Sequence, residues 1–187
     1  MNARARPAAA SVRPKRADRV RLRDGRELWI RPIVPPDAAP IAAGFKLLTD
    51  EEVRRRFLHP IKELSAEHLR KLVHPEPGRE YALVAAELLP PGEALVPAVA
   101  RLSRSEGQDD AEFALLVSHF VAGQGLGRRL LQRLIDWARR NGIRELWGHV
   151  LDDNTPMLQL AERMGFTRRR AEGAPGIVRV SLRLPPG

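Results

Sequence analysis

Apolar and polar residues alternate on both sides of Asp24-Gly25 in the stretch RVRLRDGRELWIRPI, residues 19–33. A period of two is typical of a half-buried strand, and Asp-Gly is a strong hairpin turn pair. The folded chain is therefore predicted to open with a two-stranded ribbon. Further strand patterns follow along the chain, at residues 81–88, 94–104, 111–117, 144–150, 166–171 and 176–184.

Segments whose apolar residues have helical spacing lie between some of these strands. The clearest helix follows Gly127 and ends at Asn141, and its apolar residues recur at intervals of three and four. They are Leu130, Leu131, Leu134, Ile135 and Ala138. A second helix is expected over residues 154–164, ending at Gly165. From residue 111 onward the predicted order is strand, glycine-rich loop, helix, strand, helix, strand, strand.

Three short helices are expected between the ribbon and the strand at residues 81–88. Asp37 can cap the first, which Pro40 forces to begin late or to kink. Thr49 and Glu52 form a capping box for the second, and Ser65 caps the third.

Composition favours one globular domain with a basic tail. The 187 residues are 43% hydrophobic and include no cysteine, which excludes disulfides, thiolate metal sites and a cysteine nucleophile. No apolar run is long enough to cross a membrane, and the N-terminal residues lack the apolar core of a secretory signal. We therefore expect a cytoplasmic protein without membrane contact. The five histidines show no ligand spacing, so no metal is expected.

The net charge of +9 is unevenly distributed. Five of these charges lie in residues 1–17, in an Ala/Pro/Arg stretch that cannot form a core. Residues 1–18 are therefore predicted to be a disordered tail and residues 19–187 to be a single domain. The remaining excess of about +4 argues against nucleic-acid binding, although a polyanionic small ligand fits it.

Three glycines at alternate positions, Gly123, Gly125 and Gly127, precede the long helix. A strand that runs through a glycine-rich turn into a helix presents several backbone N–H groups at the positive end of the helix dipole, and this suits a phosphate or diphosphate. The alternative is a tight turn that needs glycine only for its positive φ angles. Two common phosphate loops do not match: the third glycine of the dinucleotide motif would fall at Leu130, and no hydroxyl follows Gly127 to hold magnesium.

The loop and its surroundings resemble the GNAT acetyltransferase superfamily. Val117 is followed five positions later by Ala122-Gly-Gln-Gly-Leu-Gly127, close to the family's Gln/Arg-x-x-Gly-x-Gly/Ala, with Ala122 in the first position. The helix that starts at Asn154 and ends before Gly165-Phe166 resembles the family's next helix, and IRPIVPPDA, residues 30–38, resembles its opening. The resemblance implies an α+β fold with a twisted, mixed and mostly antiparallel central sheet of about seven strands and helices on both faces.

The resemblance also implies acetyl-CoA as co-substrate and a set of residues that bind it. Its pantetheine arm would pair with the backbone of one strand, its diphosphate would lie on the glycine loop, and Asn154 would touch the arm. Capping of the helix is the other role open to Asn154. The implied cofactor-binding residues are Leu115, Leu116, Val117, Ala122, Gly123, Gln124, Gly125, Leu126, Gly127, Arg128 and Asn154.

Glu112 is the expected general base. A lysine amine has a pKa of about 10.4, so only about one amine in a thousand is neutral and nucleophilic at pH 7. Glu112 shares a strand face with Ala114 and Leu116, where desolvation would raise the pKa of its carboxyl. A solvated strand-end acid is the alternative from the residues alone, and the family's Glu-x-Ala context favours the base. Many GNAT enzymes have a tyrosine as general acid where this chain has Ala161, which leaves the acid unassigned.

A narrower resemblance is to the acetyltransferase domain of bacterial protein lysine acetyltransferases. It rests on AEFALLV, GHVLDDNTPMLQLAERMGF and RDGRELWIRPI. It implies transfer of an acetyl group to a protein lysine, for example of an acyl-CoA synthetase, by a free-standing relative of domains that are often fused to such a synthetase-like module. A small-amine acetyltransferase and a non-catalytic acyl-CoA sensor or nucleic-acid-associated module are the alternatives, and a homodimer is left open.

Overall fold

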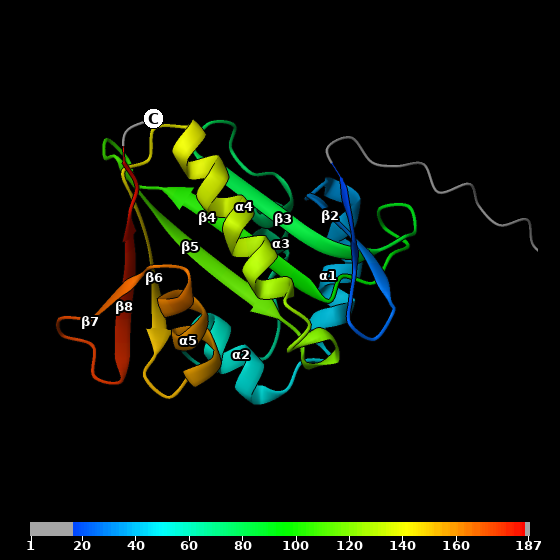
Figure 1. The fold of residues 1–187 in the computed structure, drawn as a ribbon. Helices are drawn as coiled ribbons and strands as arrows, with labels where there is room; N and C mark the ends of the chain where they lie inside the picture. The colour runs from blue at the N-terminus through cyan, green and yellow to red at the C-terminus, as the bar shows by residue number, and fades with distance from the viewer. Residues whose placement is uncertain (1–16, 186–187) are drawn as a thin grey trace, which may run out of the picture.

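Eight strands form one sheet in the order β1-β2-β3-β4-β5-β6-β8-β7 in the computed structural model, which describes residues 17–185 (Figure 1). All neighbouring strands are antiparallel except β5 and β6, which are parallel. The predicted mixed, mostly antiparallel sheet is confirmed, with eight strands instead of about seven. The strands are β1 (Asp18–Arg21), β2 (Glu27–Pro32), β3 (Glu80–Glu87), β4 (Ala98–Arg104), β5 (Asp110–Val117), β6 (Glu145–Leu151), β7 (Thr167–Arg170) and β8 (Ile177–Arg183).

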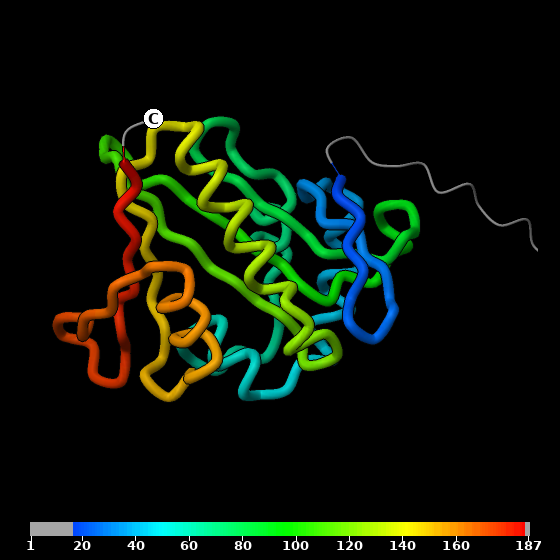
Figure 2. The backbone as a smooth tube through the Cα atoms, in the orientation of Figure 1, coloured from blue at the N-terminus to red at the C-terminus, as the bar shows by residue number. Residues whose placement is uncertain are grey.

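Helices cover both faces of the sheet, as predicted (Figure 1). Each face has its own apolar core: α4 and α5 pack on one, and α1 and α3 pack on the other. In Figure 2, α4 is seen from the side and lies across β3, β4 and β5, which it contacts. The helices are α1 (Ala38–Phe45), α2 (Asp50–Phe57), α3 (Ala66–Val73), α4 (Leu126–Arg140) and α5 (Thr155–Arg163), with short 3-10 turns at Pro35–Asp37 and His119–Val121.

The predicted basic tail, residues 1–18, lies outside the described residues except for its last two. Ala17 is buried and Asp18 is the first residue of β1, paired with Ile30. The folded part therefore includes these two residues. Across residues 17–185, the structure contains no helix with the length and apolar character needed to cross a lipid bilayer.

Asp37 does not cap α1, contrary to the sequence prediction. Its carboxylate forms two 2.7 Å bonds with the guanidinium of Arg31 and also accepts the N–H of Val34 at 2.9 Å. Both charged side chains are buried, at 2% and 0% exposure, and this bidentate pair fixes the turn between β2 and α1. The carboxylate is thus used by tertiary contacts, and α1 begins at Ala38 without a side-chain cap.

β4 is shorter than predicted. Residues 94–97 form a loop in which the N–H of Leu95 donates to the Glu87 carboxylate, and β4 starts at Ala98. Pro97 has no N–H for a strand ladder, but its carbonyl accepts the N–H of Ser118 at 2.9 Å. The capping box of Thr49 and Glu52 is present as predicted at the start of α2.

Candidate active site

β5 and β6 run side by side for three residues and then separate. Their pairing begins at Asp110 with Glu145 and ends at Glu112 with Trp147. β5 continues to Val117 along β4 alone, and β6 continues to Leu151 along β8 alone. The edge of β5 that faces β6 is therefore open beyond Glu112.

Gly148 lies where the two strands separate. A Cβ atom on this glycine would stand 2.9 Å from Cε1 and 3.0 Å from the carbonyl oxygen of Phe113. Phe113 is 4% exposed and its ring meets that of Phe166 edge-on at 5.4 Å. Only glycine thus leaves room for the buried Phe113 at the apex of the divergence, a role that the sequence analysis missed.

The register of β4 and β5 shows which backbone groups face the opening. In an antiparallel pair, residues that exchange hydrogen bonds alternate with residues that do not. Ser118 donates to Pro97, and Ser105 to the carbonyl of Asp110, which fixes the alternation. Glu112, Ala114 and Leu116 therefore bond to β4, whereas Phe113, Leu115 and Val117 direct their backbone groups toward the opening. Backbone hydrogen bonds were predicted for Leu115, Leu116 and Val117. In this register Leu115 and Val117 direct their backbone groups to the opening, whereas Leu116 bonds to β4 and still lines the cleft.

The glycine-rich loop leads from β5 into α4. Gly123 and Gly125 have φ angles of 73° and 81°, a left-handed conformation that favours glycine. A Cβ on either would meet no atom within 4 Å, so the loop surface is open. Gly127 has a different role: a Cβ there would lie 3.3 Å from Cδ2 of Leu160, because α4 and α5 pack closely at this point.

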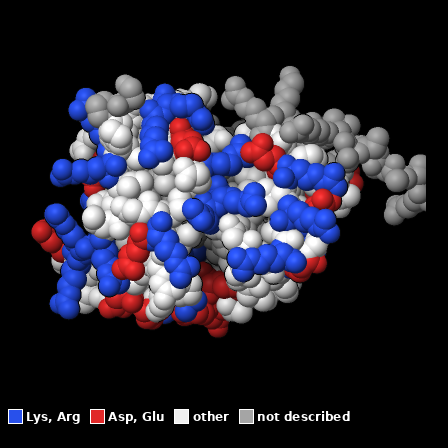
Figure 3. Space-filling model, viewed as in Figure 1, with Lys and Arg blue, Asp and Glu red and all other residues white. Residues whose placement is uncertain are grey.

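The loop presents a row of free backbone donors. Within the described residues 17–185, the N–H groups of residues 123–128 have no hydrogen-bond acceptor, and the first bond of α4 runs from Arg129 to the carbonyl of Gly125. Arg128 and Arg163 line the same cleft as this loop. Many Lys and Arg side chains, with Asp and Glu among them, are spread over the face of the molecule that Figure 3 shows. Free N–H groups at a helix N-terminus with cations beside them form an anion-binding concavity.

The divergence and the loop form one cleft of about 1060 Å³. Every predicted cofactor-binding residue lines it except Gln124, whose Oε1 accepts the N–H of Arg23 at 3.0 Å and so ties the loop to the β1–β2 hairpin. Asn154 lines the cleft and also caps α5, because its Oδ1 accepts the N–H of Met157 at 3.3 Å.

Glu112 lies in the same cleft, but its side chain is 51% exposed. The predicted desolvated environment is therefore absent in the protein by itself: Ala114 and Leu116 share the strand face, but about half of the Glu112 side chain is exposed to solvent. Nδ1 of His149, on β6, lies 3.9 Å from Oε1 of Glu112.

Helix α2 joins the two sides of the cleft. Its Glu52 accepts the backbone N–H of His119, just after β5, at 2.6 Å, and its Arg54 contacts Asp153, just after β6, at 2.6 Å. Burial disfavours the charged form of Glu52, but the hydrogen bonds from Thr49 and His119 outweigh it and keep the pKa of this carboxyl below its usual value. The sequence analysis identified the cap of α2 but not this bridging position, which no local pattern marks.

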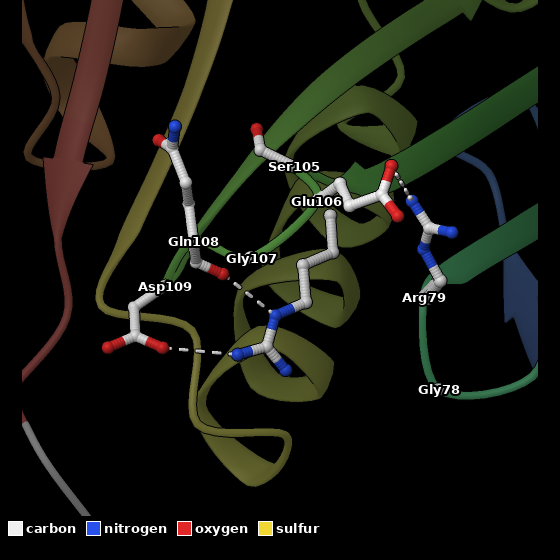
Figure 4. Close-up of a pocket in the computed structure, with 8 residues that line it drawn as sticks. Gly78, Arg79, Ser105, Glu106, Gly107, Gln108 and Asp109 are labelled. Carbon is white, nitrogen blue, oxygen red and sulfur yellow. Dashed lines mark hydrogen bonds and ion pairs between the residues drawn. The ribbon is translucent and has the colours of Figure 1, made fainter.

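A second hollow lies at the opposite end of β5, around the β4–β5 turn (Figure 4). Its two arginines already have partners: Arg104 contacts Asp109 at 3.1 Å, and Arg79 lies 4.0 Å from Glu106. The positive charges of this hollow are therefore already paired with carboxylates. Across residues 17–185, no three His, Asp or Glu side chains gather in a way that could hold a metal ion.

Comparisons with known proteins agree with this geometry. Residues 47–166 match the acetyltransferase (GNAT) family. The acetyltransferase PA5475 of Pseudomonas aeruginosa is 30% identical over 149 residues, which is 80% of each chain. The GNAT domain of Streptomyces lividans PAT has a crystal structure that superposes with a TM-score of 0.79 at 28% identity, covering 90% of this chain and 97% of that one.

The acetyltransferase Pat of Mycolicibacterium smegmatis is 28% identical over 171 residues, 89% of this chain. The chain spans about half of that relative, 49% of its length. The GNAT family uses acetyl-CoA as its acetyl donor. By sequence and by fold, the chain belongs to the GNAT family of acetyltransferases.

Proposed function

We propose that this protein transfers the acetyl group of acetyl-CoA to the side-chain amine of a protein lysine, with Glu112 as general base. One observation carries the proposal: an open strand edge, a row of free N–H donors and a carboxylate line a single cleft. The first two features suit an extended ligand that ends in a diphosphate, and the third suits proton removal from an amine.

The residues present fit coenzyme A. The free N–H groups of residues 123–128 and the side chains of Arg128 and Arg163 would hold the phosphates. The backbone of Leu115 and Val117 would pair with the amide groups of the pantetheine arm, as a neighbouring strand would. The absence of side chains at Gly123 and Gly125 lets the anion reach the backbone donors.

Glu112 is the group that would remove the proton of the amine. Bound acetyl-CoA contributes a thioester, whose acyl carbon accepts the amine nitrogen while the carbon–sulfur electron pair leaves with the sulfur. Glu112 takes the proton of the amine, directly or through a water, and returns it to solvent. Because half of its side chain is exposed here, we infer that the bound substrates complete its desolvation.

The backbone donors that face the opening have a second use. An N–H of Leu115 or Val117 would stabilise the negative charge that develops on the acyl oxygen. The general acid stays unassigned. Ala161 is buried in α5, and Tyr81 stacks on Trp137 at 5.3 Å and is not part of the cleft lining.

Replacement of Glu112 by glutamine tests the base. We expect the affinity for acetyl-CoA to stay within a few-fold while kcat falls by about 10²-fold or more. Glu145→Gln is the matched control, because Glu145 lies on the neighbouring strand outside the cleft lining. Equal turnover by Glu112→Gln and the wild type would refute the assignment.

The protein lysine is supported by similarity to Pat proteins, including the domain from Streptomyces lividans. Its test is competition: folded acyl-CoA synthetases would be offered beside polyamines, aminoglycosides and free amino acids, and acetylated products identified by mass spectrometry. Preferential acetylation of the small amines would instead assign a small-molecule acetyltransferase. The cytoplasmic location and the disordered tail stay predictions, and a homodimer stays open.

A further inference from the structure

Arg56 of α2 lines the cleft on the same side of the sheet as Glu112. Residues directly paired in an antiparallel ladder project to the same face, and Arg101 pairs with Ala114 two residues beyond Glu112. Two arginines thus share this side of the sheet with Glu112, Arg56 from the helix and Arg101 from β4. Arg101 forms an ion pair with Glu80 of β3, so its charge is already compensated.

Arg56 has no such partner. Its guanidinium lies 4.8 Å from the centre of the Phe57 ring, and within residues 17–185 it donates no hydrogen bond and forms no ion pair. Arg54 and Arg55, its neighbours on α2, are both paired with Glu51, at 2.8 and 2.7 Å. Of these three consecutive arginines, Arg55 and Arg56 line the cleft, and Arg56 is the one without a carboxylate partner among the described residues.

The negative charge of Glu112 only partly compensates the charge of Arg56. Burial, and then repulsion by Arg101, lower the pKa of Arg56 to about 10, and the attraction of Glu112 does not offset them. The side chain is nonetheless charged at neutral pH. A cation held in a site that disfavours its charge gains from an added anion, and a guanidinium binds a carboxylate through two parallel hydrogen bonds.

We propose that Arg56 is a specificity residue that binds a carboxylate of the acceptor, so that the preferred lysine has an aspartate or glutamate beside it. This rests on the proposed function, because it places the acceptor over Glu112. The carboxylate would lie on Arg56 while the lysine amine reaches Glu112 on the same side of the sheet. The net charge of +9 would also draw an acidic acceptor toward the protein.

Matched peptides test the proposal. Each contains one lysine, flanked on either side by aspartate or by its neutral isostere asparagine, and acetylation is measured by mass spectrometry. We expect the wild type to prefer the aspartate peptide by about tenfold in kcat/KM, as for a charge-assisted hydrogen bond. Arg56→Gln should lose this preference, and Arg56→Lys should keep part of it. Arg56→Glu should reverse it when arginine, which adds a positive charge but no second acceptor amine, replaces the flanking aspartate.

Arg70→Gln is the matched control, since it removes the same charge from α3, outside the cleft lining. Calorimetry with acetyl-CoA gives an independent measure of the cofactor site, which Arg56→Gln should leave unchanged. The same preference can be measured without turnover. The protein is saturated with coenzyme A, and fluorescence anisotropy gives its affinity for each of the two labelled peptides.

Three results would overturn the proposal. The first is an equal affinity of the wild-type protein for both peptides. The second is an equal loss of rate on both peptides in Arg56→Gln, which would make Arg56 a residue that positions Glu112. The third is a weakened affinity of Arg56→Gln for acetyl-CoA, which would make Arg56 a cofactor-binding residue. Failure of the wild-type protein to bind acetyl-CoA would instead refute the proposed function.

Discussion

Substitution of Gly148 by alanine should destabilise the protein and disturb the cleft together. The added Cβ would lie 2.9 Å from Cε1 and 3.0 Å from the carbonyl oxygen of Phe113, whereas ordinary contacts between carbon atoms are about 3.5–4.0 Å. The two strands would have to move apart by about 0.5–1 Å. Phe113 cannot turn away, because it is 4% exposed and one of the contacts is with its backbone.

Overpacking of this kind costs about 1–3 kcal/mol, so the midpoint of urea unfolding should fall by the corresponding amount. The movement occurs at the apex of the β5–β6 divergence, so we also expect the affinity for acetyl-CoA to drop several-fold in calorimetry. Gly44→Ala is the control: it lies in α1, its Cβ would meet only the Val96 carbonyl at 3.7 Å, and alanine favours the helix by up to about 1 kcal/mol.

A double-mutant cycle with Phe113→Leu separates this cause from a general loss of stability. Leucine removes the ring atoms that the new Cβ would meet, so the double variant should be more stable than the sum of the two single effects by about 1 kcal/mol. Strict additivity, or a Gly148→Ala protein as stable as the wild type with unchanged affinity, would show that the close approach of Phe113 does not matter.

Three further predictions concern stability and the loop. Asp37→Ala leaves Arg31 charged and buried without its partner, so the free energy of unfolding should fall by about 3–5 kcal/mol in urea titrations. The pKa of Glu52 is lowered in the folded protein, so this carboxylate stabilises the fold above its ordinary pKa of 4.5, and that stabilisation is lost as the pH falls below 4.5. Glu52→Gln should therefore be less stable than the wild type at pH 7 and should lose less stability between about pH 5 and pH 3. Gly125→Ala forces a side chain into a φ of 81°, which should cost about 1–2 kcal/mol and weaken acetyl-CoA binding, measured by calorimetry; unchanged binding would argue against the loop as the phosphate site.

The sequence by itself determined those features that depend on neighbouring residues. The capping box at Thr49, the amphipathic α4 and the glycine loop before it arise from contacts within a few positions, so their patterns are readable along the chain. These local signals, in the right order, produced the resemblance to the GNAT family, and that resemblance implied the fold class and eleven cofactor-binding residues, ten of which line one cleft. Gln124 was the exception, because its side chain turns to the β1–β2 hairpin instead.

Only the tertiary structure decided what surrounds the reacting groups. The pairing of β5 with β6 stops where Phe113 meets Gly148, and Arg56 comes to face Glu112 from a helix far away in the sequence. Asp37, which a local rule assigns to a helix cap, is taken by the buried Arg31. Strand register and helix placement follow from packing between segments that are distant in the sequence. A pattern of a few neighbouring residues does not specify which distant side chain will pack against those residues.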